Sequence, residues 1–331
     1  MAKINLYITS HGKITRKANT IYFIKAVENG IEKHIIPIKK LRGIHCMARV
    51  SVSSGAIHYL SRHNVPIHFY NKYGYYLGSL MPRKYLLSGY LLVNQVKHYL
   101  NREARLYIAK QFIYGALSNM ARALDKHRGL EKVAEEIRRY RDDIERASDI
   151  ETLMSIEGNS RSIYYQSFNK ILPREYHFSI RTRRPPKTRI DALISFGNSL
   201  LYGTVLTEIY HTQLDPTISY LHQPSERRYS LSLDISEVFK PIIVDRTIFT
   251  LVNRYGLDPE TDFHREMAYT LLSREGREKF LKVYEEVLRS TVRHRSLKRK
   301  VTIQNLIRLE CYKLIKHILG LEKYRALVAW W

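Results

Sequence analysis

The sequence has little cysteine and no long apolar run. Its 331 residues include two cysteines, Cys46 and Cys311, which are far apart and form no CxxC pair. Neither a zinc site nor a disulfide framework is therefore indicated, and a reducing cytoplasm is the expected setting. No stretch of about 18 apolar residues is present, so we expect no membrane span. The first residues also lack the basic, apolar and small-residue order of a secretory signal peptide.

Two common catalytic motifs are missing as well. The chain has no GxxxxGK[ST] phosphate loop, so ATP hydrolysis is not indicated. It also has no G-x-S-x-G elbow, which carries the nucleophile of many hydrolases. A thiol nucleophile has little support, because Cys46 lies in the predicted β-rich domain and Cys311 lies near the C-terminus. The candidates for chemistry are therefore acids and histidines.

Acidic residues are few relative to basic ones. The chain has 55 Lys and Arg against 31 Asp and Glu, a net charge of +24. Residues 1–92 contain 14 basic residues and only two acids, Glu28 and Glu32. Solubility alone needs a much smaller excess, so we expect a polyanionic partner such as nucleic acid. A membrane surface is the less favoured partner, because no segment reads as a basic amphipathic helix with an aromatic apolar face.

Hydrophobic periodicity divides the chain near residue 90. Residues 1–86 alternate apolar and polar positions between turn signals, with one short helix near 53–63, which predicts a small β-rich domain. From about residue 90 the apolar positions recur at helical spacing, which predicts a larger all-α domain over 90–331. The fold class is therefore α+β. Further helices are expected at about 130–147, 149–171, 189–212, 230–254, 261–273, 275–294 and 302–318.

One polar cluster lies in an apolar setting at residues 221–245. Asp234 and Glu237 are three residues apart, which places both carboxylates on one face of a predicted helix beside its apolar positions. Acids at the edge of a core need a cation or hydrogen-bond donors. A divalent ion would suit them, with His222 admitted as a further ligand. Taken alone, the segment is more simply read as a solvated helix face.

Glu157 is a second candidate. It follows Leu153, Met154 and Ile156 and precedes the small residues of 158–160, where a backbone or a ligand could approach closely. By itself it too is more simply read as a surface acid of a helix. Nearby acids lie in a run dense in Lys, Arg and Glu, which is typical of a solvated helix with ion pairs.

Ordered motifs along essentially the whole chain give these residues a context. The most specific are Leu214-Asp215-Pro216, Leu221-His222-Gln223-Pro224, Leu233-Asp234-Ile235-Ser236-Glu237, Phe239-Lys240-Pro241 and Val244-Asp245. Upstream of them are Ile14-Thr15-Arg16-Lys17, Ile156-Glu157-Gly158, Tyr164, Arg184-Pro185-Pro186, 191–197 and 200–202. Together these segments resemble the CRISPR-associated integrases, the larger of the two universal adaptation proteins (Cas "one").

The resemblance implies an activity and a site. The family inserts short DNA spacers into a repeat array, by attack of a 3′-hydroxyl on a phosphodiester, and cuts DNA when water attacks instead. Its metal ligands match Glu157, His222 and Glu237, which would hold Mg²⁺ or Mn²⁺. Asp234 matches a further acid that lies beside the metal and is counted here as catalytic.

The resemblance also implies partners. Duplex and branched DNA would be the substrates, and the protein would form a homodimer through the β-rich domain and bind the small adaptation protein Cas "two". Basic and aromatic residues near the site are the expected nucleic-acid contacts, by phosphate pairing or base stacking. They are Tyr164, Arg183, Arg184, Lys187, Arg227, Arg228 and Lys240.

Two other functions fit the same composition. A basic protein of two domains could be a non-enzymatic nucleic-acid-binding factor whose acids are ordinary ion-pair partners. Such a protein would bind equally well in chelator and yield no product. A metal-dependent RNA nuclease is the other alternative, and competing DNA and RNA substrates would distinguish it.

Overall fold

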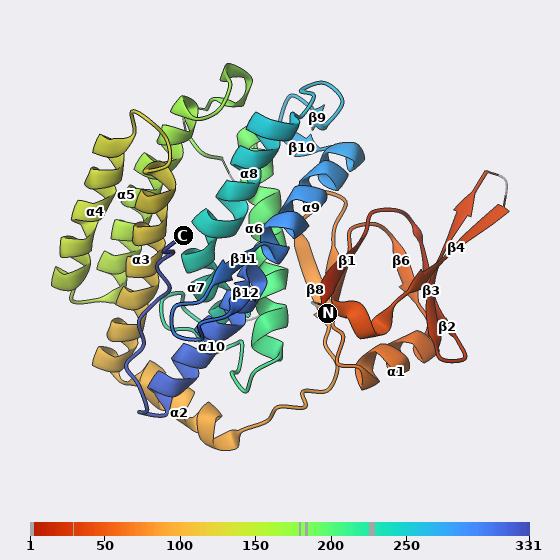
Figure 1. Ribbon diagram of the computed structural model, residues 1–331, viewed down its shortest axis with the longest axis horizontal. Helices are drawn as coiled ribbons and strands as arrows, with labels where there is room; N and C mark the ends of the chain where they lie inside the picture. Colours follow the sequence, from red (N-terminus) through yellow and green to blue (C-terminus); the bar gives the residue numbers. More distant parts are fainter. Residues whose placement is uncertain (1–2, 29, 179, 183–184, 225–228) are drawn as a thin grey trace. The chain divides into compact units, whose positions relative to one another are not determined.

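A computed structural model describes residues 3–28, 30–178, 180–182, 185–224 and 229–331 (Figure 1). The chain divides into two compact units, Met1–Leu87 and Ser88–Trp331. The first is rich in strands and the second in helices, which confirms the predicted α+β class. None of the helices in the described ranges is long and apolar enough to cross a bilayer.

The first unit contains two four-stranded sheets. One has the order β1-β5-β7-β8, with β8 antiparallel to β7 and the other pairs parallel. Its strands are β1 (Ile4–Ile8), β5 (Leu41–Cys46), β7 (Ile67–Tyr70) and β8 (Tyr76–Leu80). The other has the order β4-β3-β2-β6. Its strands are β2 (Gly12–Lys17), β3 (Thr20–Val27), β4 (Gly30–Ile36) and β6 (Val50–Val52).

A single apolar cluster joins these elements within the unit. Ile14 and Ile21, which share one face of their sheet, and Ile44 of the other sheet are almost completely buried in it. The short helix α1 (Ser54–Arg62) adds Leu60 to the cluster. It begins where the Ser53 hydroxyl accepts a hydrogen bond from the Ala56 amide, an N-cap that satisfies one free donor.

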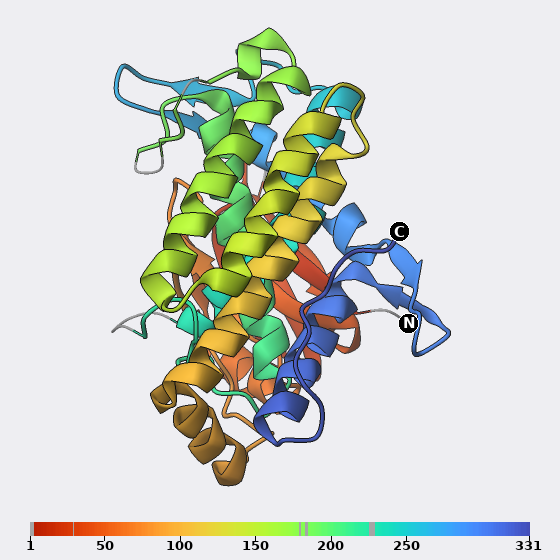
Figure 2. The same cartoon turned by 90° about the vertical axis from the view of Figure 1, so that its left-hand side faces the viewer.

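The second unit is built around helix α6 (Arg189–Tyr210), which is buried on nearly every side (Figure 1). Helices α3, α4 and α5 run side by side (Figure 2), and α3 and α6 both pack on α7. The remaining helical bounds are α2 (Gly89–Leu100), α3 (Arg102–Leu124), α4 (Glu131–Arg146), α5 (Ile150–Gln166), α7 (Ser230–Phe239), α8 (Arg246–Thr250), α9 (Arg274–Arg289) and α10 (Ile303–Ile318).

The helix that carries Glu237 has an irregular middle. Beyond α7 it continues through the π-helical turn η4 (Lys240–Asp245), then α8 and a second such turn, η5 (Leu251–Tyr255). The widening coincides with Pro241, which has no amide hydrogen to donate to the preceding turn. The expected helix over 230–254 is thus present, with two π-helical turns that the sequence pattern did not predict.

The prediction that this unit is all-α is wrong in detail, because it contains two short hairpins. One pairs β9 (Phe263–Arg265) with β10 (Thr270–Leu272), and the other pairs β11 (Thr291–Arg293) with β12 (Lys300–Thr302). The first replaces the helix expected over 261–273. Distant partners hold it, since the Thr270 amide and hydroxyl donate to the carbonyls of Pro186 and Lys187. Sequence periodicity does not report such long-range hydrogen bonds.

Candidate active site

Helices α5 and α7 bring Glu157 and Glu237 together around one arginine. Arg161 lies one turn after Glu157 on α5, and its Nε donates to Oε1 of Glu157. Its Nη2 donates to Oε2 of Glu237 on α7 at 2.5 Å. The Arg161 side chain is 4% exposed, and those of Glu157 and Glu237 are 12% and 5% exposed. A buried guanidinium therefore bridges two carboxylates from different helices.

Lys240 is a second cation in this cluster. It lies one turn after Glu237, and its Nζ donates to Oε1 of Glu237 at 2.5 Å. Burial alone would raise the pKa of Glu237, but Lys240, Arg161 and His222 hold it well below its usual range. Burial lowers the pKa of Lys240, against the attraction of Glu237. Two carboxylates and two cations thus balance in charge, which makes their burial tolerable.

Asp234 holds the loop that carries His222. Its carboxylate is fully buried and accepts the amides of Tyr220 at 2.6 Å, Leu221 at 3.0 Å and His222 at 2.9 Å. Oδ1 also lies 2.8 Å from Nδ1 of His222. A hydrogen on Nδ1 satisfies this contact and leaves the lone pair of Nε2 available. Asp234 thus positions His222, and its own oxygens are already engaged by donors.

The protonation of His222 responds to both acids. Burial opposes the imidazolium, but the hydrogen bond and charge of Asp234, together with the charge of Glu237, outweigh burial and raise the pKa of His222. Glu237 and His222 are therefore electrostatic neighbours, although they are not in hydrogen-bond contact. Glu237 therefore acts electrostatically on the imidazole of His222 and is also paired with Arg161 of α5.

The loop before α7 is held at further points. Gln95 of α2 donates through Nε2 to the Asp215 carbonyl at 3.2 Å and accepts the Asp215 amide at 2.8 Å. Arg105 donates to the carbonyl of Tyr220 at 2.9 Å, and Ser219 donates to that of His222 at 2.6 Å. The Leu-Asp-Pro and Leu-His-Gln-Pro motifs are thus parts of one braced loop that presents His222.

A fully buried acid, Asp245, is an electrostatic neighbour of Arg161. Burial raises the pKa of Asp245 to about 7, against the lowering effect of Arg161 and Arg181. Its charge raises the pKa of Tyr164, after burial itself. The Tyr164 ring is completely buried and packs edge-to-face on Phe168, with ring centroids 5.1 Å apart. The prediction that Tyr164 contacts nucleic acid is therefore wrong in this structure, because no base can reach the ring.

Comparison with known proteins identifies the family. The family model "CRISPR associated protein Cas1" matches residues 6–286. The chain belongs to the Cas1 family. A "CRISPR-associated endonuclease Cas1 3" from Thermodesulfovibrio yellowstonii is 44% identical over 99% of both chains, and a "CRISPR-associated endonuclease Cas1" from Pyrococcus horikoshii is 46% identical over 100% of both.

Solved structures agree with the Cas1 assignment. A CAS1 protein from Thermotoga maritima superposes with a TM-score of 0.88 at 40% identity, covering 98% of this chain and 99% of that one. A casposase bound to integration product gives a TM-score of 0.85 at 23% identity, over 98% and 93% of the two chains. The second likeness shows a shared fold.

The Cas1 chain has donor atoms suited to a metal ion, but they do not form a preformed coordination site in this structure. In the described ranges, no three His, Cys, Asp or Glu residues are arranged so that they could hold an ion. Arg161 instead occupies the space between the two carboxylates. Among described residues, Oε2 of Glu157 and Nε2 of His222 have no ion pair or hydrogen bond. Two carboxylates and an imidazole are donors that Mg²⁺ and Mn²⁺ accept, so the donor chemistry fits.

The other predicted contacts have different outcomes. Lys240 points into the cluster, paired with Glu237, whereas Lys187 is exposed on the segment before α6. Four predicted residues lie outside the described ranges, namely Arg183, Arg184, Arg227 and Arg228.

Arg161 was not predicted, although its spacing of four from Glu157 is the signal that could have found it. Asp245 belongs to a quoted motif, but its spacing did not predict that it is an electrostatic neighbour of Arg161.

Proposed function

We propose that this Cas1 chain is a divalent-metal-dependent DNA endonuclease and integrase of CRISPR adaptation. The observation that supports this most is that Glu157 and Glu237 meet at Arg161 from two helices, while His222 on a third segment is an electrostatic neighbour of Glu237. The net charge of +24 suits a DNA substrate. Relatives that share nearly half of the sequence are named endonucleases.

The reaction would be phosphoryl transfer without a protein nucleophile. A DNA 3′-hydroxyl attacks a phosphorus atom, a new P–O bond forms, and the bond to the 3′-oxygen of the cut strand breaks. The attacking hydroxyl loses its proton, and the leaving oxygen gains one. Water in place of the hydroxyl gives simple cutting. No cysteine or serine needs to be activated, which agrees with the burial of both thiols.

The residues of the cluster would divide the work. Glu157, Glu237 and Nε2 of His222 would hold Mg²⁺ or Mn²⁺, which when bound polarises the phosphoryl group and lowers the pKa of the attacking hydroxyl. Asp234 keeps the imidazole in the required tautomer and orientation. Lys240 and Arg161 keep the buried Glu237 carboxylate ionised. Both cations would also help to offset the negative charge of a phosphate bound at the cluster.

Partners follow from the same family. We propose that the chain forms a homodimer through its β-rich unit and acts with a Cas2 protein on duplex and branched DNA. Support comes from a solved Cas6-RT-Cas1–Cas2 complex, whose matching chain superposes on this one with a TM-score of 0.81 at 21% identity. Size measurements of the purified protein, alone and with Cas2, would test this assembly.

The catalytic assignment can be tested with three variants and one matched control. Glu157→Gln, Glu237→Gln and His222→Ala should each lose resolution of branched DNA in Mn²⁺ or Mg²⁺. Glu136→Gln, an exposed acid on α4, should keep it. Full activity in all three folded variants would refute the site. Product formation in chelator would refute the metal requirement, and preference for RNA over DNA in competition would favour the RNA nuclease.

A further inference from the structure

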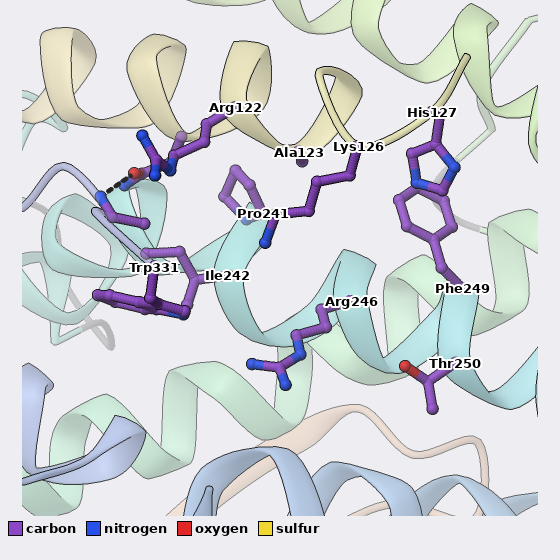
Figure 3. Close-up of a pocket in the computed structure, with 12 residues that line it drawn as sticks. Arg122, Ala123, Lys126, His127, Pro241, Ile242, Arg246, Phe249, Thr250 and Trp331 are labelled. Atoms are coloured by element: carbon purple, nitrogen blue, oxygen red, sulfur yellow. Dashed lines mark hydrogen bonds between the residues drawn. The ribbon is translucent and has the colours of Figure 1, made fainter. Parts of the chain in front are cut away.

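A cavity lies away from the catalytic cluster, among the end of α3, the η4–α8 segment and the C-terminal residues. It has a volume of about 240 Å³. Figure 3 shows Lys126 on the α3 side and Arg246 on the α8 side, with Trp331 at one end and the His127–Phe249 ring pair at the other, and all of them line the cavity. Arg122 lies on the α3 wall. None of these residues belongs to the cluster around Arg161.

The three cations of this cavity lack anionic partners. Among the described residues, Arg122, Lys126 and Arg246 form no ion pair, and Nε of Arg122 is buried without a hydrogen-bond partner. Asp125, the nearest acid in sequence, is taken by Arg138. Arg122 is half-buried, whereas Lys126 and Arg246 are exposed at the cavity wall. Several other cations of this unit do have carboxylate partners. Examples are Arg161 with Glu157, Lys279 with Asp262 and Arg308 with Glu208.

The three charges also act on one another. Partial loss of water lowers the pKa of Lys126, and the charges of Arg246 and Arg122 lower it further. Loss of water likewise lowers the pKa of Arg246. Like charges that converge on one cavity repel, and an anion placed between them relieves that repulsion. The cavity is smaller than the roughly 300–1,000 Å³ of usual small-molecule pockets, so it suits a phosphate group better than a whole nucleotide.

A neighbouring hollow continues the same chemistry. It lies over the β11–β12 hairpin, shares Trp331 with the cavity, and adds Arg293, Arg295 and Lys298. Trp330 lies under the guanidinium of Arg295, 5.6 Å from the ring centroid, and meets Trp331 edge-to-face at 4.9 Å. Cations in series with flat aromatic rings are the pattern by which proteins bind single-stranded nucleic acid.

We propose that the cavity binds a backbone phosphate of a single nucleic-acid strand, which continues over Trp331 onto the β11–β12 hairpin. Arg122, Lys126 and Arg246 hold the phosphate, while the indole of Trp331 stacks on a base. The strand class rests on the proposed function, since DNA is the substrate there. The phosphate site itself requires only the cations of the cavity.

The test compares two variants that each lose two exposed cations. Lys126→Gln/Arg246→Gln removes charge from the cavity, and Lys132→Gln/Arg139→Gln removes it from the outer face of α4. Binding of a fluorescent single-stranded DNA is followed by anisotropy in chelator over a salt series. The cavity variant should bind about tenfold more weakly, with a salt slope reduced by roughly one to 1.5. The α4 variant should change affinity by less than about twofold.

A third variant tests the stacking residue. Trp331→Ala should weaken binding roughly fivefold or more with little change in salt slope, because stacking releases no counterions. Equal affinity of the cavity and α4 variants would overturn the proposal. The proposal would also be overturned if inorganic phosphate raised the melting temperature of wild type more than that of the cavity variant while both bound DNA with equal affinity. The site would then bind a free anion.

Failure of this site and failure of the proposed function give different results. Glu157→Gln should lose resolution of branched DNA but keep wild-type affinity for single-stranded DNA in chelator. If Glu157→Gln remains active, the catalytic assignment fails whatever the cavity does. If only the cavity variant behaves like its control, the catalytic assignment stands and the strand path is wrong. Far-ultraviolet circular dichroism of each variant verifies the fold.

Discussion

Asp234→Asn is the most informative single change, because it keeps the shape of the side chain but removes a charge that interacts with three backbone amides and with His222. The carboxylate is fully buried and accepts three backbone amides besides facing Nδ1 of His222. An amide has one oxygen, so at least one pair of these donors would face an NH₂ group instead. Hydrogen bonds to charged acceptors contribute about 1.5–3 kcal/mol each, and a buried unsatisfied donor costs about 1–3 kcal/mol.

The free energy of unfolding should therefore fall by about 2–5 kcal/mol. The pKa of His222 should fall too, because burial would remain while the charge that opposes it is lost. Activity should drop about 10–100-fold, as is typical when a residue that orients a ligand is replaced. Urea denaturation, the pH profile of DNA resolution and nuclear magnetic resonance titration of His222 measure the three effects.

Asp142→Asn is the matched control, since Asp142 is exposed on α4. It should change the free energy of unfolding by less than about 0.5 kcal/mol. If Asp234→Asn equals this control in stability and leaves the pH profile unmoved, the positioning role of Asp234 is refuted. If stability falls but the His222 pKa does not, Asp234 supports the loop without orienting the imidazole.

Three further outcomes follow from buried groups. Arg161→Leu should lower the free energy of unfolding, measured by urea denaturation, by about 3–5 kcal/mol, because two buried carboxylates would lose their shared cation. Mn²⁺ should raise the melting temperature of this variant more than that of wild type. Burial lowers the pKa of His68 to about 3 and that of His45 well below its usual value. The stability that these neutral imidazoles contribute is therefore complete above about pH 6.5 and declines as the pH falls toward 3. Equal urea midpoints at pH 7 and pH 5 would contradict this. Gly276→Ala should destabilise α9, since its Cβ would lie 2.2 Å from the Asp262 carbonyl, and an unaltered thermal midpoint would show that the backbone yields there.

The sequence predicted the main division of the fold because periodicity is a local property. The alternation before residue 87 and the helical spacing after it correspond to the two compact units. The hairpin over Phe263–Leu272 was missed because its backbone partners, Pro186 and Lys187, lie about 80 residues away. Pattern reading assigns short segments of this kind to whichever period they happen to match.

The site shows a similar limit. Spacing placed Asp234 and Glu237 on one helical face, and both are buried, yet they serve different partners. Asp234 faces its own preceding loop, whereas Glu237 reaches Arg161 on α5, 76 residues earlier in the chain. Only packing of α5 against the region of α7 decides that second contact. The family resemblance identified Asp234 and Glu237 as site residues among the neighbouring acids, but it did not predict the part played by Arg161.

We expect Glu157, His222 and Glu237 to bind one divalent ion together. Anomalous diffraction from crystals grown with Mn²⁺ tests it most directly. We expect one anomalous peak within bonding distance of all three side chains, with Arg161 displaced from at least one carboxylate. An enzyme that is active in Mn²⁺ but whose crystals show Arg161 still bridging Glu157 and Glu237, with the peak elsewhere, would contradict it.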